Sequence, residues 1–212
     1  MVVQAADMAR AVRVAIDMNR GDEPLLMEGD SDTLTLDETI HAKLADAVRM
    51  VEMEAPAIML ESGHDFGGEG VFIGKDGKGF VVLPDDFMRL VAFRMSDWHR
   101  TVHDAIDENS PEYAMQSSRW KGICGNPEKP VCAIVRRPEG KVLEFYSSRD
   151  DTASVTQASY VPRPRIDAVG GIDVAEDCYR AAVYRAAALV LSSLGDGLST
   201  TMLEISKSLI NG

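Results

Sequence analysis

The residues best suited to chemistry in this sequence are two histidines, His99 and His103, four positions apart. They share one face whether the segment is helical or extended. Imidazole nitrogens bind transition metals, and Asp104 and Asp107 are the nearest side chains for a further ligand. The glutamate of an HExxH zinc motif is missing, so surface histidines are the commoner explanation of such a pair. We expect no metal site, and a metal- or small-ligand-binding role of the His99/His103 region is the alternative function.

Two glycine-rich segments superficially resemble loops that hold phosphates. Residues 64–70 (HDFGGEG) precede a predicted strand, whereas a dinucleotide-binding loop follows a strand and opens a helix. Residues 74–79 carry Lys75 and Lys78 without the spacing of a P-loop. Both segments therefore predict turns in β-structure, and no cofactor is expected.

The three cysteines lack the surroundings of a reactive thiol. Cys124 and Cys132 are separated by two prolines, and the sequence offers no base and orienting group for a nucleophile. Cys132 and Cys178 lie in apolar patterns and are predicted core residues, while Cys124 is in a loop. An odd number without CxxC spacing argues against a disulfide framework or a zinc ribbon and fits synthesis in a reducing cytoplasm. With no GxSxG elbow either, we expect no enzyme; an enzyme or metal protein using His64, Cys124 and the histidine pair is a competing hypothesis.

Aromatic residues beside turns suggest a binding surface instead. Trp98 and Trp120 flank predicted turns, and tryptophan and arginine are enriched at interface hot spots. A lid over the core explains them equally well, and a pocket for a small molecule or peptide near them is a third hypothesis. The interface candidates are Trp98, Trp120, Arg163, Arg165, Tyr179 and Leu209.

Composition limits the classes of partner. The chain of 212 residues has a formal net charge of −12, so its average surface repels phosphates and anionic membranes. The closest basic candidates, Arg136 and Arg137 together with Arg163 and Arg165, are too few to predict DNA readout. No apolar run is long enough to span a membrane. Charged residues within the first 17 positions interrupt any signal-peptide core.

Hydrophobic periodicity predicts helices at both ends and β-structure between them. Predicted helices cover residues 5–19, 35–54 with a short turn to residue 60, 110–117, 176–194 (ending at Gly195) and 199–210. Thr35 and Glu38 form a capping box that starts the second of these. Predicted strands cover residues 71–73, 80–83, 131–137, 142–147 and 152–161. Residues 87–95 fit a helix as well, and their aromatic and β-branched content favours a strand. Residues 162–171 (PRPRIDAVGG) predict an extended crossing without regular structure.

The order of elements indicates an α+β fold, in which N-terminal and C-terminal helices pack together with a β-rich central segment of antiparallel hairpins. With no long linker, we expect a single domain over residues 1–212, helical over 4–60, β-rich over 71–161 and helical over 174–210. The predicted helix before the last one, which begins at Glu176, is apolar nearly all round and is therefore expected to be buried on most sides.

Four segments together resemble a known family. They read ETIHAKLADAVRMVEMEAP (38–56), LPDDFMRLVAFRMSDWHRTV (83–102), YVPRPRID (160–167) and DCYRAAVYRAAALVL (177–191). In this order they resemble the head–tail adaptor (connector or gatekeeper-like) proteins of tailed bacteriophages, including those carried in gut bacterial genomes. Where many such proteins have an extended C-terminal arm, this sequence predicts an amphipathic helix.

The resemblance implies a non-enzymatic virion protein, made in the host cytoplasm. Such adaptors form a homo-oligomeric ring of about twelve copies under the portal and extend the DNA channel. The implied partners are copies of the chain itself, the portal, neighbouring tail or connector proteins, and DNA that passes without sequence-specific binding. No cofactor and no membrane are implied. The acidic charge suits a conduit along which DNA slides without adhering.

Overall fold

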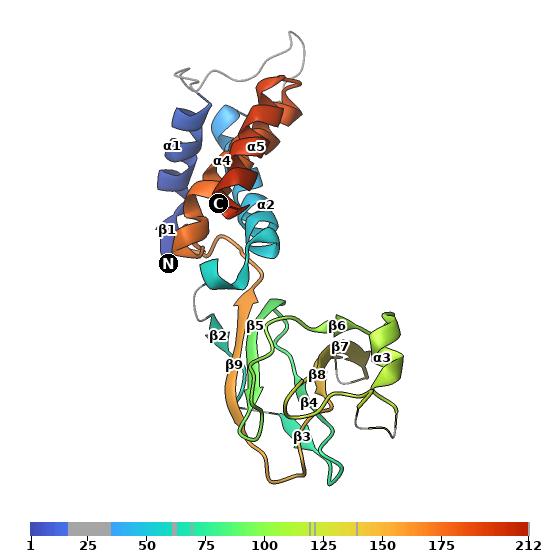
Figure 1. Cartoon of the computed structure of the whole chain (residues 1–212). Helices are drawn as coiled ribbons and strands as arrows, with labels where there is room; N and C mark the ends of the chain where they lie inside the picture. The colour runs from blue at the N-terminus through green and yellow to red at the C-terminus, as the bar shows by residue number, and fades with distance from the viewer. Residues whose placement is uncertain are drawn as a thin grey trace. The chain divides into compact units, whose positions relative to one another are not determined.

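The structure is a computed structural model that describes residues 1–16, 35–60, 63–68, 70–118, 120, 122–138 and 140–211. Its contacts divide the chain into two compact units, which are shown in Figure 1. Residues 1–61 and 163–212 form one, called here the helical unit, and residues 62–162 form the other, called the β unit. The two units are described separately.

This division differs from the single domain expected over residues 1–212. The terminal helices pack together, as predicted, and the β-rich middle of the sequence is a separate compact unit. The chain passes between the units near residues 61 and 163, where the sequence has no long Gly- or Ser-rich stretch. Because such a linker is missing, the amino-acid composition does not indicate the boundary between the two units.

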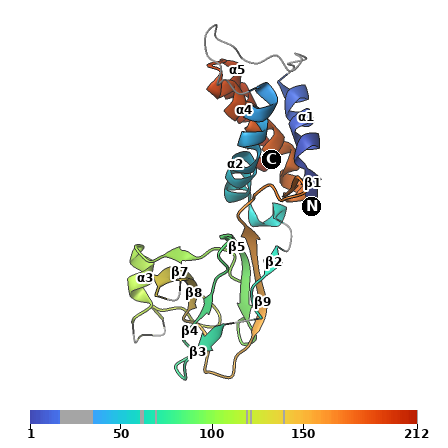
Figure 2. The ribbon, with the colours of Figure 1, turned by 180° about the vertical axis from the view of Figure 1, so that it is seen from behind.

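The helical unit is built around its penultimate helix, α4. Alanines dominate the buried side of α4 and let neighbouring helices approach closely, and α4 packs against α1, α2 and α5. Figures 1 and 2 show these helices side by side from opposite directions. The prediction of a helix buried on most sides is confirmed. The elements of the unit are β1 (Val2–Gln4), α1 (Ala5–Ala15), α2 (Leu36–Glu54), the 3-10 turn η1 (Ala57–Met59), β10 (Gly171–Asp173), the 3-10 turn η2 (Glu176–Cys178), α4 (Tyr179–Ser193) and α5 (Leu198–Asn211).

The predicted capping box begins α2. The Glu38 backbone N–H donates to Oγ1 of Thr35 at 3.2 Å, and the Thr35 N–H donates to Oε2 of Glu38 at 2.8 Å. These two bonds satisfy backbone donors that a helix start otherwise leaves unpaired. The helix predicted to end near residue 19 is described only as far as Ile16, and the rest of it lies outside the described residues.

A short two-stranded sheet joins the N-terminal segment of the helical unit to the segment that precedes α4. In it β1 pairs antiparallel with β10, with Val3 opposite Ile172. Gly171 belongs to β10, so the segment 162–171 is not wholly irregular, which corrects the prediction. A strand of three residues is too short for periodicity to reveal, and its partner lies far away in sequence.

A buried arginine fastens the C-terminal helices to α2. Arg185 of α4 is almost fully buried, and its Nη1 and Nη2 donate to the two carboxylate oxygens of Glu54 at 3.0 and 2.6 Å. Its Nε donates to Oγ of Ser206 on α5 at 3.3 Å. The guanidinium lowers the pKa of Glu54, whose side chain is half exposed. One side chain thus connects three helices.

In its described residues, the β unit has two sheets and one short helix. Its sheets have the strand orders β2-β9-β5 and β3-β4-β8-β7-β6, antiparallel throughout except for β6 with β7. The predicted hairpins and the strand 87–95 are confirmed. The elements are β2 (His64–Asp65), β3 (Val71–Ile73), β4 (Gly79–Val82), β5 (Phe87–Met95), β6 (Ile106–Asp107), α3 (Pro111–Met115), β7 (Cys132–Arg137), β8 (Gly140–Phe145) and β9 (Val155–Pro162).

The core of the β unit places Trp98 inside it, not at an interface. Trp98 is only 1% exposed, and its ring meets Phe93 of β5 and Phe145 of β8 edge-on at 5.6 and 6.3 Å between centroids. Both sheets contribute to this cluster. Of the two interpretations of Trp98, burial supports the core residue. A turn-flanking tryptophan reads the same in sequence whether its ring points inward or outward.

Candidate functional site

The most chemically varied cluster of the β unit lies on the face of the β3-β4-β8-β7-β6 sheet that carries Glu144. Strand register places Phe72 opposite Phe80, Phe80 opposite Glu144, and Glu144 opposite Ala133. Residues directly opposite one another on neighbouring strands share a face, so this row runs across four strands. The other face of these strands supplies core residues such as Leu143 and Phe145.

Glu144 is a buried carboxylate surrounded by donors. Arg137, the last residue of β7 in the same hairpin, donates from Nε at 2.9 Å and from Nη2 at 2.6 Å to Oε1. The hydroxyl of Tyr113 on α3 donates to Oε2 at 3.2 Å, and that of Tyr146 donates to the same oxygen. Both carboxylate oxygens are therefore hydrogen-bonded, as a buried charge requires.

This arrangement raises the pKa values of Tyr113 and Tyr146. Burial and the hydrogen bond to the Glu144 carboxylate raise the pKa of Tyr146 far above its ordinary value. Burial and the charge of Glu144 also raise the pKa of Tyr113. Both phenols stay protonated at neutral pH and act as donors, not as bases.

Beside the carboxylate lies an aromatic and cationic surface. The guanidinium carbon of Arg137 stands 4.2 Å from the centroid of the Phe80 ring, within the range of a cation–π contact. Phe80 is stacked on Phe72 with centroids 4.8 Å apart, and Phe72 is 55% exposed. A shallow hollow of about 360 Å³ is lined by these rings together with Lys78, Arg137, Glu144 and Tyr146.

The cluster is suited to binding. The carboxylate is held in place by three side chains, so it orients Arg137 instead of accepting a substrate proton. Within the described residues, Nη1 of Arg137 has no hydrogen-bond partner and remains available to an anionic group. An aromatic platform beside an arginine favours a partner that combines apolar and acidic groups.

Removing the carboxylate tests this arrangement. We expect Glu144→Ala to lower the free energy of unfolding by about 2 kcal/mol, since Arg137 and two tyrosines lose their acceptor. Tyr146→Phe deletes a single hydrogen bond, and we expect it to cost about 1 kcal/mol. Urea unfolding followed by tryptophan fluorescence measures both. Equal losses for the two variants would contradict the role of Glu144 as the shared acceptor.

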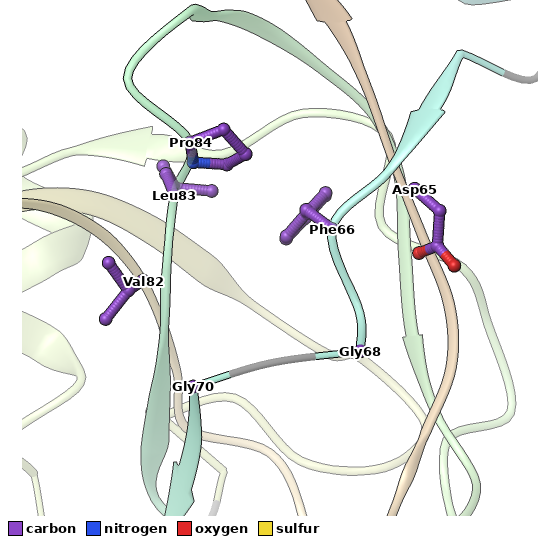
Figure 3. A pocket seen from close by; sticks show the side chains of 7 residues that line it. All are labelled: Asp65, Phe66, Gly68, Gly70, Val82, Leu83 and Pro84. Carbon is purple, nitrogen blue, oxygen red and sulfur yellow. The ribbon is translucent and has the colours of Figure 1, made fainter.

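A second hollow, of about 560 Å³, borders the glycine-rich segment 64–70 and is shown in Figure 3. Phe66 lies on one side of it and Leu83 and Pro84 on the other. Its only charged lining residue among those described is Asp65, whose Oδ1 already accepts from the Gly67 N–H at 2.8 Å. A carboxylate at the rim disfavours phosphate, so this segment is no phosphate cradle.

The second glycine-rich segment is the turn of the β3–β4 hairpin. Gly77 has a φ of +76°, and a Cβ on it would lie 1.9 Å from the carbonyl oxygen of Ser148. Close approach of two backbone segments, not phosphate binding, therefore explains this glycine. The side chain of Lys78 donates to the Gln116 carbonyl oxygen at 3.3 Å.

The predicted histidine pair is exposed and lies after β5. Nδ1 of His103 is 2.8 Å from the carbonyl oxygen of Val91, and the His99 N–H donates to the Pro127 carbonyl at 2.9 Å. Within the described residues, no three His, Cys, Asp or Glu side chains come close enough to hold a metal ion. Neither the histidines nor Cys124 lines either hollow described above.

Two of the cysteines lie in the cores, as predicted. Cys132 and Cys178 are buried, and burial raises the pKa of the Cys132 thiol well above its ordinary value. A thiol that stays protonated is a poor nucleophile. Cys124 is partly exposed and contacts the Trp120 carbonyl oxygen.

The remaining interface candidates are distributed over both units. Trp120 of the β unit is largely exposed, as are Arg163 and Arg165 of the helical unit. Tyr179 and Leu209 are half-buried on α4 and α5. Their role at an interface stays a prediction.

None of the interface residues predicted from the sequence belongs to the Glu144 cluster. Its signal is a glutamate inside an apolar strand, in the stretch KVLEFY of residues 141–146. A charged residue on a buried strand usually has a partner, yet the identity of the partners depends on strand register.

In comparisons with known proteins, no family model matches the chain, and no curated protein matches it significantly. No helix among the described residues is both long and apolar enough to cross a membrane.

Proposed function

We propose that this chain is a non-enzymatic structural protein of a tailed-phage virion, a head–tail adaptor. It assembles with copies of itself into a ring of about twelve under the portal and extends the DNA channel. Its other partners are the portal, neighbouring tail or connector proteins, and DNA that passes without sequence-specific contacts. The sequence resemblance motivates the family, and surface properties of both units support a role in assembly.

The observation that carries the proposal is that both units expose large apolar side chains on a highly charged chain. Phe72 and Trp120 are exposed on the β unit, and Met53 and Ile58 on the helical unit. Exposed aromatic and methionine side chains are enriched at protein interfaces. Like charges keep such a chain soluble until a complementary surface covers them.

The acidic net charge of the chain supports a DNA channel. Residues 1–61 and 163–212, the helical unit, carry 19 acidic and 10 basic residues, whereas residues 62–162 carry 15 and 12. The net charges are therefore −9 and −3. Seven of the 19 acidic and one of the 10 basic residues of the helical unit lie outside the described residues, at 17–34 and 61. An acidic surface that faced the channel would repel the phosphates and let DNA slide.

Binding to a portal tests the proposal directly. We expect the full chain, mixed with the portal ring encoded beside it, to bind as a ring with the portal's own symmetry in negative-stain electron microscopy. Genes for portal, capsid or terminase next to this one are the matching genomic observation. A chain that binds no portal or neighbouring ring protein contradicts the proposal.

A further inference from the structure

We infer that the two units are separate cooperative domains and that the β unit is an insertion, able to unfold while the helical unit stays folded. The inference goes beyond the proposed function and does not depend on it. It rests on the adjacent ends of the β unit, on the separate cores of the two units, and on contacts of the helical unit that span the insertion.

The first and last strands of the β unit bring its two ends together. β2 pairs antiparallel with β9, with His64 opposite Tyr160, and Figures 1 and 2 show the two strands side by side. The approach is closest at Gly63, whose φ is +67° and where a Cβ would lie 2.4 Å from the Tyr160 carbonyl oxygen. The chain therefore enters and leaves this unit at one place, as it does in inserted domains, whose termini lie close together.

The helical unit is completed across the insertion. α1 and α2 precede residue 62, α4 and α5 follow residue 162, and α4 packs against the other three helices. The Ala175 backbone N–H donates to Oε1 of Glu52 at 2.9 Å, and β1 pairs with β10. These contacts join the two outer segments of the chain directly. An unfolded insertion would add only loop-closure entropy to them, and this cost grows slowly with loop length.

Each unit buries a core of its own. In the β unit, Phe93, Trp98 and Phe145 belong to one cluster to which both sheets contribute. In the helical unit, Met8 and Ile40 are fully buried. The units have roughly 100 residues each, and domains of about 55–65 residues already fold alone. Each unit therefore buries enough apolar surface to fold as a cooperative domain.

Each unit also contains an arginine–glutamate pair in which one partner is buried. In the helical unit, Nη2 of Arg185 donates to Oε2 of Glu54 at 2.6 Å. In the β unit, Nη2 of Arg137 donates to Oε1 of Glu144, also at 2.6 Å. The variants Glu54→Ala and Glu144→Ala therefore remove the same kind of bond, one from each unit.

Native-state hydrogen exchange of the full chain reads the two units separately. Amides of α4 report the opening of the helical unit, and amides of β8 report the opening of the β unit. We expect Glu144→Ala to speed exchange in β8 about tenfold or more and to leave exchange in α4 unchanged. We expect Glu54→Ala to do the reverse, since each substitution destabilises only the unit that contains it.

Asp46→Ala is the matched control. Asp46 also pairs with an arginine, Arg49, at 3.3 Å, but both of these side chains are more than half exposed. An exposed pair of this kind contributes little to stability. We expect its removal to change exchange by less than about twofold in α4 and in β8 alike.

A chain that unfolds as one cooperative domain would respond differently. Either glutamate variant would then speed exchange in α4 and β8 equally, and this result overturns the inference. If Glu144→Ala leaves the β unit unfolded altogether, protected α4 amides support the inference and unprotected ones overturn it. Portal binding by the wild-type chain tests the proposed function separately, so either can fail without the other.

Discussion

Trp98→Ala is expected to destabilise the β unit by about 3–5 kcal/mol. The indole is 1% exposed and touches Phe93 and Phe145 from two different sheets, so truncation opens a cavity where the sheets meet. Urea or thermal unfolding of the full chain, followed by far-UV circular dichroism, measures the loss. Self-association is expected to change only as far as the folded fraction does.

Trp98→Phe is the matched control. Nε1 of Trp98 is buried without a hydrogen-bond partner among the described residues, so phenylalanine removes an unsatisfied donor while keeping most of the apolar volume. We expect it to cost less than about 1.5 kcal/mol. A stable Trp98→Ala variant that fails to assemble would instead assign Trp98 to an interface.

Glu54→Ala is expected to lower the free energy of unfolding of the helical unit by about 3 kcal/mol. The change leaves the buried guanidinium of Arg185 with Ser206 as its remaining side-chain partner. Arg185→Met removes the charge but retains an apolar side chain of similar length, and we expect it to cost only about 1 kcal/mol. Chemical denaturation measures the free energy of unfolding of both variants. If Arg185→Met loses more stability than Glu54→Ala, the hydrogen bonds of Arg185 outweigh the cost of burying its charge.

The same pair gives the chain a pH dependence. Arg185 lowers the pKa of Glu54 in the folded chain below its ordinary value of 4.5. A carboxyl whose pKa is lower in the folded state stabilises the fold fully above its unfolded pKa and loses that contribution as pH falls through the folded one. The stability difference between wild type and Glu54→Ala should therefore be constant near neutral pH and shrink below about pH 4.5.

Much of the local structure follows from the sequence, as two elements illustrate. The Thr35–Glu38 capping box fixes the start of α2 through bonds within one turn. The hairpin of β7 and β8 follows from two apolar runs around a turn of a few residues. Both depend on interactions between near neighbours, which periodicity and turn residues report directly.

The candidate site is different, because its members meet only through strand register. Phe72, Phe80, Glu144 and Ala133 come from four strands, and shifting one strand by a single residue would turn its side chain to the opposite face. Tyr113 reaches Glu144 from α3, 31 positions away in sequence. The sequence pointed to the histidines and tryptophans by residue type alone. In the structure, an arginine and two tyrosines are hydrogen-bonded to Glu144 instead.

By itself the sequence determined the α+β class, the helical ends, the strongly acidic charge and the core positions of Cys132 and Cys178. Tertiary structure alone decided that the chain forms two compact units, that Trp98 is buried, and that Arg185 connects three helices. The physical reason is the range of the interactions. Helix caps, turns and hydrophobic patterns act over a few residues, while burial and polar partners are set by contacts between segments far apart along the chain.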